Sequence, residues 1–305
     1  MHFTIKRQKI KNMMLPLAMI GGAIFYKWMG YLTFLSPYLI FLMLFITYCK
    51  INYRDFKPKR FHLILLGVQM LLSAIVYLAV LPFSHKVAEG LFICVFIPTA
   101  TAAPVITSML GGSISFVATY SLLCNVVVAI GGPFVLAQIG DAADMTFLKS
   151  VSLIAMKVFP LLILPLLTAI VLRYLSPRLH TTIKEHQQLS FYLWAVSLFI
   201  IVGSCVSFTI NNFKISETWN IIFLAIGALI VCLLQFYIGR KIGRRNGDAV
   251  SGGQSLGQKN TVLAVWMAMA YMNPIASVAP AAYIAWQNIV NSIQLMKHSE
   301  KVNIK

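Results

Sequence analysis

Apolar stretches of membrane-spanning length cover almost the whole chain, and two of them are interrupted by proline, glycine and polar residues. Of the 305 residues, 59% are hydrophobic and 11% are charged, and the mean hydropathy is +0.81. A soluble domain carries roughly a quarter charged residues, so we expect an all-α membrane protein. Inside a bilayer, an interrupted helix frees backbone groups that are costly unless something pairs with them.

Ten stretches are long enough to cross a bilayer, at about 20 residues per span. They lie near residues 13–31, 33–50, 61–82, 87–110, 113–138, 158–176, 189–210, 218–239, 249–271 and 275–296. The Gly111-Gly112 link predicts a tight hairpin between the fourth and fifth spans. Residues 144–157 are less apolar, and we expect an interfacial helix there before the sixth span. The chain 1–305 is therefore expected to form a single transmembrane domain.

Basic residues lie mostly on one side of these spans. With a cytoplasmic N-terminus, nineteen of the 25 lysines and arginines fall in cytoplasmic segments and five fall outside. The positive-inside rule then predicts a multi-pass protein of the inner (plasma) membrane with both termini in the cytoplasm. The net charge of +17 comes from these short clusters, so we expect a lipid bilayer and no nucleic acid as partner.

The two halves of the chain, at 13–138 and 158–296, begin with spans that run in opposite directions. Each half has its interrupted span in fourth place, near 97–104 and 251–261. Paired interruptions of this kind indicate the binding site of a transporter. We therefore expect two inverted five-helix repeats, with the fourth and ninth helices broken and crossing near the midplane of the membrane.

Each break combines helix-disrupting residues with polar side chains. Pro98 and Pro104 each lack an N–H, and Gly253 and Gly257 loosen the second helix. We expect the polar side chains to bind a solute or an ion, because they are unlikely to face lipid. The candidates are Gln254, Ser255, Gln258, Lys259, Asn260 and Thr261 in the second break, Thr99 and Thr101 in the first, and Ser121 and Asn288 in other spans.

Lys259 is the strongest candidate, because it lies too far from either end of its span to reach water. An ammonium at the bilayer centre costs about 2.5–3.5 kcal/mol on the most lenient scale. None of the eight acidic residues lies mid-span to pair with it. Four alternatives remain open: it binds an anionic solute, its ammonium fills a cation site, it is uncharged, or it donates to carbonyls freed in the fourth span.

Metal and cofactor chemistry has little support in the sequence. The five cysteines are scattered singly without a CxxC pair, and none of the six histidines falls mid-span. We therefore expect no cofactor and no metal site.

The stretch Ser255–Thr261 (SLGQKNT), followed by an apolar helix and the stretch Ala285–Asn288 (AWQN), resembles the bile acid:sodium symporter family. The resemblance covers nearly the whole chain in layout and is specific around the two breaks. It implies ten spans in inverted five-span repeats with crossing broken helices. It also implies transport of an amphipathic or small organic anion through the cavity beside the crossing point.

The chain departs from this family where sodium is held. The family has an acidic residue where this chain has Ser255 and a glutamine where it has Lys259, whereas Asn260 matches. The two changes raise the local charge by two units, which makes sodium binding unfavourable. We therefore hypothesise a divergent, bacterial-type, sodium-independent member in which Lys259 replaces the bound cation.

The sequence thus predicts a secondary active transporter of organic anions, bile-acid-like or small carboxylates, that works by alternating access. The chain contains no GxxxxGK[ST] loop of the kind used by ATP-driven pumps. Two alternatives remain open: an intramembrane enzyme that uses Lys259 as nucleophile or base, and a receptor that binds a solute without cycling. Uniport, exchange and proton coupling are each compatible with this chemistry, and no pattern specifies an oligomeric state.

Overall fold

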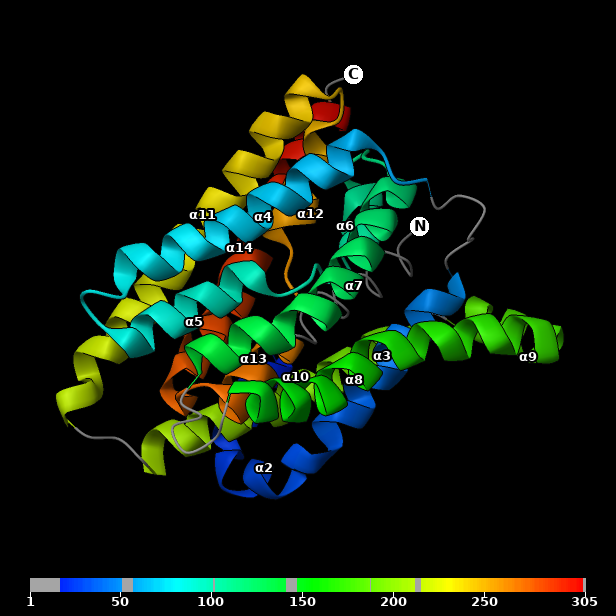
Figure 1. The fold of residues 1–305 in the computed structure, drawn as a ribbon. Coiled ribbons are helices and arrows are strands. Elements are labelled where there is room, and N and C mark those ends of the chain that lie inside the picture. Colours follow the sequence, from blue (N-terminus) through cyan, green and yellow to red (C-terminus); the bar gives the residue numbers. More distant parts are fainter. Residues whose placement is uncertain are drawn as a thin grey trace. The chain divides into compact units, whose positions relative to one another are not determined.

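The computed structural model describes residues 17–50, 57–100, 102–140, 147–186, 188–211 and 215–303. Over these ranges the chain is almost entirely helical and has no strand (Figure 1). Five of the described helices are long and apolar enough to cross a membrane. The prediction of an all-α membrane protein is confirmed at this level.

The described helices fall into two compact units. The first unit contains α2 (Tyr26–Leu32), η1 (Thr33–Leu35), α3 (Ser36–Lys50), the part of α8 (Phe147–Leu175) that begins at Pro165, α9 (Pro177–Glu185) and α10 (Gln188–Asn211). Helix α10 packs against α2 and α3. Ser204 on α10 donates to the Met29 carbonyl at 3.0 Å and forms a 2.9 Å hydrogen bond with the hydroxyl of Thr33.

Helix α8 differs from the sequence prediction. It runs without interruption from Phe147 to Leu175, so residues 147–157 continue into the predicted sixth span instead of forming a separate interfacial helix. The segment is rich in helix-forming residues and contains no proline before Pro160, so nothing in it ends the helix. Residues 144–146 of the predicted interfacial helix lie outside the described part of the chain.

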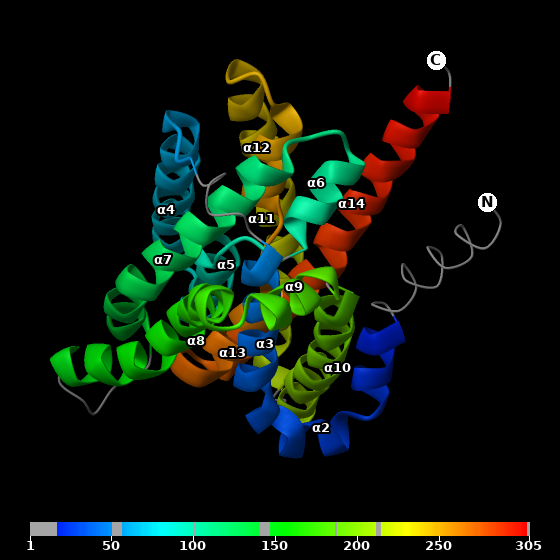
Figure 2. The same cartoon turned by 90° about the vertical axis from the view of Figure 1, so that its right-hand side faces the viewer.

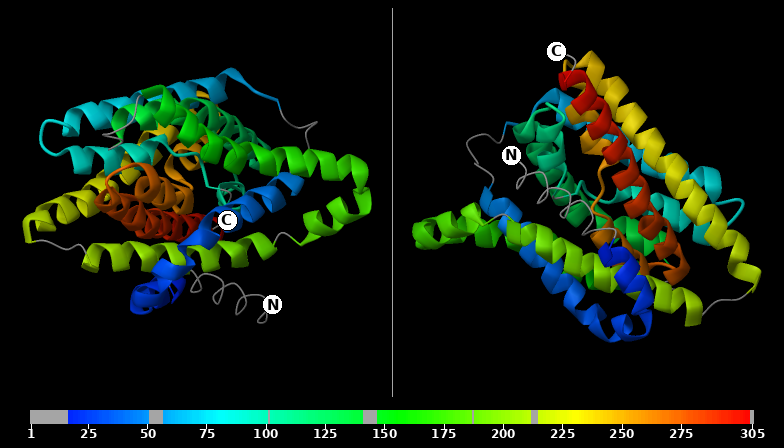
Figure 3. Two further views of the ribbon diagram at one scale, coloured as in Figure 1. Left: turned by 60° about the horizontal axis from the view of Figure 1, so that its bottom comes forward. Right: turned by 180° about the vertical axis from the view of Figure 1, so that it is seen from behind.

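The second unit holds both predicted breaks. It contains α4 (Arg60–Val80), α5 (His85–Phe96), α6 (Ala103–Met109), α7 (Ile114–Ile139), the first part of α8, η3 (Ile215–Glu217), of which Glu217 belongs here, α11 (Thr218–Arg245), α12 (Ala249–Gly257), α13 (Thr261–Tyr271), η4 (Pro274–Ser277) and α14 (Val278–Asn303). Figure 2 shows α12 beside α6 and α7, and Figure 3 shows α11 running along α14; these helices are in contact.

The first interruption lies where the sequence predicts it. Helix α5 ends at Phe96 and α6 begins at Ala103, with Pro98 in the non-helical segment. Pro104 plays a different part from the one expected, because it stands in the first turn of α6. Proline is tolerated there, since the first N–H groups of a helix have no intrahelical partner. Pro104 therefore belongs to a helix start and not to the break itself.

The second interruption is shorter than predicted. Helix α12 continues through Gly252 and Gly253 and ends at Gly257, and only residues 258–260 are non-helical. The glycines permit close packing instead of loosening the helix. A Cβ on Gly253 would lie 2.6 Å from Cγ of Arg240, and one on Gly257 would lie 2.4 Å from the Phe236 ring. The prediction that Gly253 breaks the helix is therefore wrong, whereas Gly257 is the last residue of α12 and lies directly before the break.

The predicted hairpin between α6 and α7 is present. Gly111 has a φ of 79°, a left-handed conformation that favours glycine. The N–H of Gly112 then donates to the Thr107 carbonyl at 2.9 Å, which turns the chain back immediately after α6. The two glycines thus fix the direction in which α7 leaves the first broken helix.

Replacing Gly111 tests this turn. We expect Gly111→Ala to lower the free energy of unfolding by about 1–2 kcal/mol, because alanine is strained at this φ. Gly67→Ala is the matched control, since Gly67 lies inside α4 with no atom within 4 Å of an added Cβ; we expect a gain of about 0.5–1 kcal/mol there. Thermal unfolding of the two variants in detergent measures both effects, and equal stabilities would contradict the role of the turn.

Candidate functional site

The two interruptions meet in space and pair through their backbones. The N–H of Ala100 donates to the Gln258 carbonyl at 3.1 Å, and the N–H of Asn260 donates to the Pro98 carbonyl at 2.9 Å. Thr99 and Lys259 thereby form an isolated antiparallel bridge. We call residues 97–100 and 258–260 the junction. Each break supplies hydrogen bonds that the other loses by leaving the helix. This pairing lowers the free-energy cost of unpaired backbone groups in a membrane.

Lys259 lies at the centre of the junction with a fully buried side chain, 1% exposed. Its ammonium donates to the Val95 carbonyl at 2.9 Å and to the Ile97 carbonyl at 3.2 Å. Both carbonyls belong to the end of α5 and its continuation, where no following turn of helix can take them up. The contact is the one expected of a lysine that serves carbonyls freed by the break, and it also places a positive charge where a cation would find oxygen ligands.

Gln287 on α14 holds the backbone of Lys259 from the other side. Its Oε1 accepts from the Lys259 N–H at 2.9 Å, and its Nε2 donates to the Lys259 carbonyl at 3.4 Å. A buried amide side chain therefore pairs with Lys259 as a neighbouring strand would. Its neighbour Asn288, the predicted site residue, donates instead to the Ile284 carbonyl of its own helix at 2.8 Å.

Two glutamine–tyrosine pairs support the helices at the junction. Gln69 on α4 donates to the Phe96 and Ile97 carbonyls at 2.9 and 3.0 Å, and its Oε1 accepts from the Tyr120 hydroxyl at 2.6 Å. Gln235 on α11 donates to the Tyr283 hydroxyl at 2.9 Å. Tyr283 on α14 in turn donates to the Gly257 carbonyl at 2.9 Å, at the end of α12. Each broken helix thus has a carbonyl end held by one such pair.

The predicted residues of the second break face the junction to different degrees. The Ser255 carbonyl accepts from the Thr99 hydroxyl at 2.7 Å, and Asn260 caps α13 by accepting from the Leu263 N–H at 3.3 Å. Gln254 points elsewhere and donates to Gln294 on α14 at 2.9 Å. Ser121 on α7 reaches the junction and donates to the Thr99 carbonyl at 3.3 Å. Thr101 lies outside the described residues.

Several buried polar atoms near the junction have no hydrogen-bond partner in the described part of the chain. They are Ser255 Oγ, Gln258 Nε2, Thr261 Oγ1 and Asn125 Oδ1. Buried polar atoms are normally paired, so each unpaired one calls for an explanation such as a bound water, ion or solute. The backbone groups that pair across the junction are satisfied, whereas several polar side-chain atoms in and around it are not, which is the arrangement expected where a ligand completes the bonding.

The charge at the junction is not balanced by a nearby carboxylate. Within the described residues the ion pairs are Lys86 with Glu217 and His85 with Glu89, and neither includes Lys259. In its charged form, with no carboxylate partner, Lys259 raises the local potential and disfavours a second cation. It favours an anion in its place.

Sequence reasoning missed Tyr120 and Tyr283, whereas Gln69 and Gln287 are polar residues within predicted spans, for which the sequence favoured packing over ligand contact. A signal for part of this set was present, because Tyr120 and Tyr283 each precede an asparagine by five positions in the last span of their half. Asn125 and Asn288 also make the same bond, donating to the carbonyl four residues back at 2.8 Å.

Comparison with protein-family models and with curated proteins gives no match for this chain. The geometry described above is therefore the basis for a functional assignment.

Removing the amide of Gln287 tests the support of the junction. We expect Gln287→Leu to lower the free energy of unfolding by about 1–3 kcal/mol, because the buried Lys259 N–H loses its acceptor. Asn288→Leu is the matched control, since that amide bonds only within its own helix, and we expect a smaller loss. Thermal unfolding in detergent compares the two, and a smaller effect for Gln287→Leu than for its control would contradict this geometry.

Proposed function

We propose that this chain is a secondary carrier that moves small or amphipathic organic anions across the plasma membrane by alternating access. The observation that carries the proposal is the meeting of two interrupted helices, with a buried ammonium where they pair. Interrupted helices that cross in this way supply carriers with polar backbone and side-chain groups for a solute inside the membrane.

The two glutamine–tyrosine pairs favour an inverted repeat in this chain, the arrangement on which alternating access is proposed to depend. Gln69 and Tyr120 occupy the third and fifth spans of the predicted first half, and Gln235 and Tyr283 occupy the third and fifth spans of the second. Repeated units place equivalent residues in equivalent spans. We therefore retain ten spans in two inverted halves, 13–138 and 158–296, with both termini cytoplasmic, as part of the proposal.

Lys259 is proposed to take the place of a bound cation. The Val95 and Ile97 carbonyls give its ammonium the oxygen ligands that a sodium ion would require. Ser255 stands where the symporter family that the sequence resembles has an acidic residue, so a carboxylate that would attract sodium is missing. Transport by this chain is therefore expected to proceed without sodium.

The solute is proposed to be an anion bound beside the junction. An ammonium has three N–H donors, and two of them are used for the α5 carbonyls, so the third remains for a ligand. Gln258 Nε2 is a second unsatisfied donor nearby in sequence. Serine and threonine hydroxyls, at Ser255 and Thr261, would accept from hydroxyl groups of the same solute.

Uptake into proteoliposomes tests the proposal directly. A labelled panel of bile-acid-like and small carboxylates is offered with and without a sodium gradient. We expect uptake that does not depend on sodium, and we expect Lys259→Met to reduce it by about tenfold or more, since charge-assisted bonds are worth about 1.5–3 kcal/mol. Lys241→Met is the matched control, because Lys241 is an exposed lysine on α11, and it should transport like the unaltered protein.

The state of the recovered solute separates this proposal from its rivals. A carrier accumulates the solute unchanged inside the vesicles, an enzyme converts it, and a receptor binds it without accumulation. Sodium-driven uptake that survives in Lys259→Met would show that the lysine does not replace a cation. Size-exclusion profiles and unfolding temperatures of the variants establish that a lost flux is not a lost fold.

A further inference from the structure

A second polar cluster lies away from the junction, where α11, α12 and α14 come together. It consists of Arg240, Gln254, Asn291 and Gln294, and we call it the Arg240 cluster. Nη2 of Arg240 donates to Gln294 Oε1 at 2.8 Å, and Nε2 of Gln254 donates to the same oxygen at 2.9 Å. Gln254 Nε2 also lies 3.5 Å from Asn291 Oδ1. One amide oxygen, on Gln294, therefore serves two donors.

The bonds inside the Arg240 cluster leave three of its buried atoms without partners. Among the described residues nothing bonds Arg240 Nε, Asn291 Nδ2 or Gln254 Oε1. Gln254 is 0% exposed and Asn291 is 4% exposed, so both amides are buried. Two of the three atoms are donors and one is an acceptor. A network that served only to pack three helices would pair such atoms with one another.

The free donor of Arg240 lies on the edge of the guanidinium that binds oxyanions best. Nε and Nη2 point the same way and form a planar fork that matches two oxygens of a carboxylate or a phosphate. In this structure Gln294 Oε1 occupies one arm of the fork, and the other arm is empty. Gln294 is partly exposed, and an anion that took the place of its oxygen would find both arms.

Gly253 shapes this cluster. A Cβ there would lie 2.6 Å from Cγ and 3.3 Å from Nε of Arg240, so the arginine side chain lies directly against the backbone of α12. Any larger residue at this position would displace the fork. The close approach of Arg240 explains why a glycine stands at position 253 inside a continuous helix.

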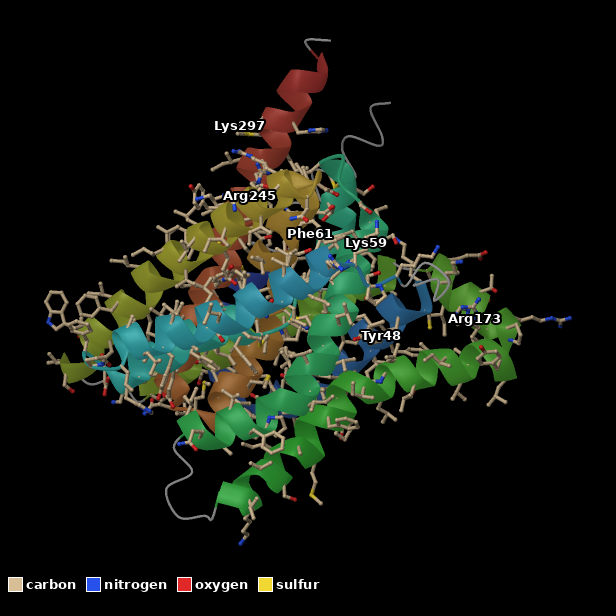
Figure 4. The ribbon with its side chains drawn as sticks, turned by 45° about the horizontal axis from the view of Figure 1, so that its top comes forward. Tyr48, Lys59, Phe61, Arg173, Arg245 and Lys297 are labelled. Carbon is tan, nitrogen blue, oxygen red and sulfur yellow. The ribbon has the colours of Figure 1, made fainter. Side chains whose placement is uncertain are left out.

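The surroundings of the Arg240 cluster are positively charged. Neither ion pair among the described residues includes Arg240. Lys241, Arg244 and Arg245 follow it on α11, and Figure 4 shows Arg245 and Lys297 at the same end of this unit, on two helices that are in contact. A guanidinium that has no carboxylate partner and is flanked by other cations attracts an anion from solution.

We propose that the Arg240 cluster is a binding site for an oxyanion, separate from the junction. The anion accepts from Nε and Nη2 of Arg240 and from Nδ2 of Asn291, and it replaces the oxygen of Gln294. Two sources share this chemistry: the carboxylate of an organic solute and inorganic phosphate. Monohydrogen phosphate also carries a hydroxyl that can donate to Gln254 Oε1, whereas a carboxylate leaves that atom unpaired. Phosphate is therefore the better match.

Titration calorimetry on the purified full chain in detergent tests the site without any need for transport. Inorganic phosphate, sulfate and acetate are the probes. We expect saturable binding, strongest for phosphate because sulfate and acetate have no hydroxyl at neutral pH. Saturable acetate binding without phosphate binding would still support the oxyanion site and would assign it to a carboxylate.

Four variants fix the location. Arg240→Lys keeps the charge and loses the fork, and Gly253→Ala displaces the fork with no change of charge; each should weaken binding by about tenfold or more. Gln294→Ala removes the competing oxygen and should strengthen binding. Arg245→Lys is the control on the same helix and should bind like the unaltered chain.

Absence of saturable binding, or equal affinities in the unaltered chain and Arg240→Lys, would overturn this inference. The result is independent of the proposed carrier activity. Uptake that persists in a chain that binds none of the three anions would remove the Arg240 site alone, and saturable anion binding by a chain that moves no solute would remove the carrier alone.

Discussion

The structure of the second unit depends on one interaction, the backbone pairing of two segments that have left their helices. Ala100 and Asn260 donate across the junction, and the carbonyls that receive them belong to the opposite break. Neither interruption is acceptable alone in a membrane, because each frees groups that water cannot reach. The backbone pairing leaves several carbonyls and one N–H group without a backbone partner. Lys259, the two glutamine–tyrosine pairs and Gln287 form hydrogen bonds with these groups. Without this backbone pairing, the groups to which these side chains bind would not be held in place.

Glycine has opposite effects in isolation and in this packing. In an isolated helix each glycine costs about 1 kcal/mol relative to alanine, and the run in α12 therefore predicts a break there. In the structure the missing side chains let α11 approach until the backbones of Gly239 and Gly252 almost touch, since a Cβ on Gly239 would lie 2.3 Å from the Gly252 oxygen. The helix gains contacts along its whole length, and these outweigh its weak propensity. Tertiary packing, which a single sequence does not reveal, decided where the helix ends.

Much of the site was nevertheless predictable, for physical reasons that are local. Pro98 cannot donate to a helix, so the first break follows from residue type alone. Lys259 cannot reach water along its span, so its burial and its need for oxygen ligands follow from helix length. The partner of its backbone was harder to identify, because Gln287 and Asn288 are adjacent and both polar, and only the rotation of α14 selects the first. The direction of Gln254, away from the junction, depends on the same rotation.

The covalent attachment of the ammonium has an energetic consequence. A sodium ion that binds on one side of a membrane and leaves on the other brings with it the free energy of its concentration difference and of the membrane voltage. The nitrogen of Lys259 is bound to the chain and cannot be diluted into either compartment. A protein that fills its cation position with a lysine keeps a positive charge at the site, but it cannot use the free energy of an ion gradient to drive transport. In the proposed carrier, a solute that passes beside this fixed charge with no coupled proton or exchanged solute would move until its electrochemical potential is equal on both sides.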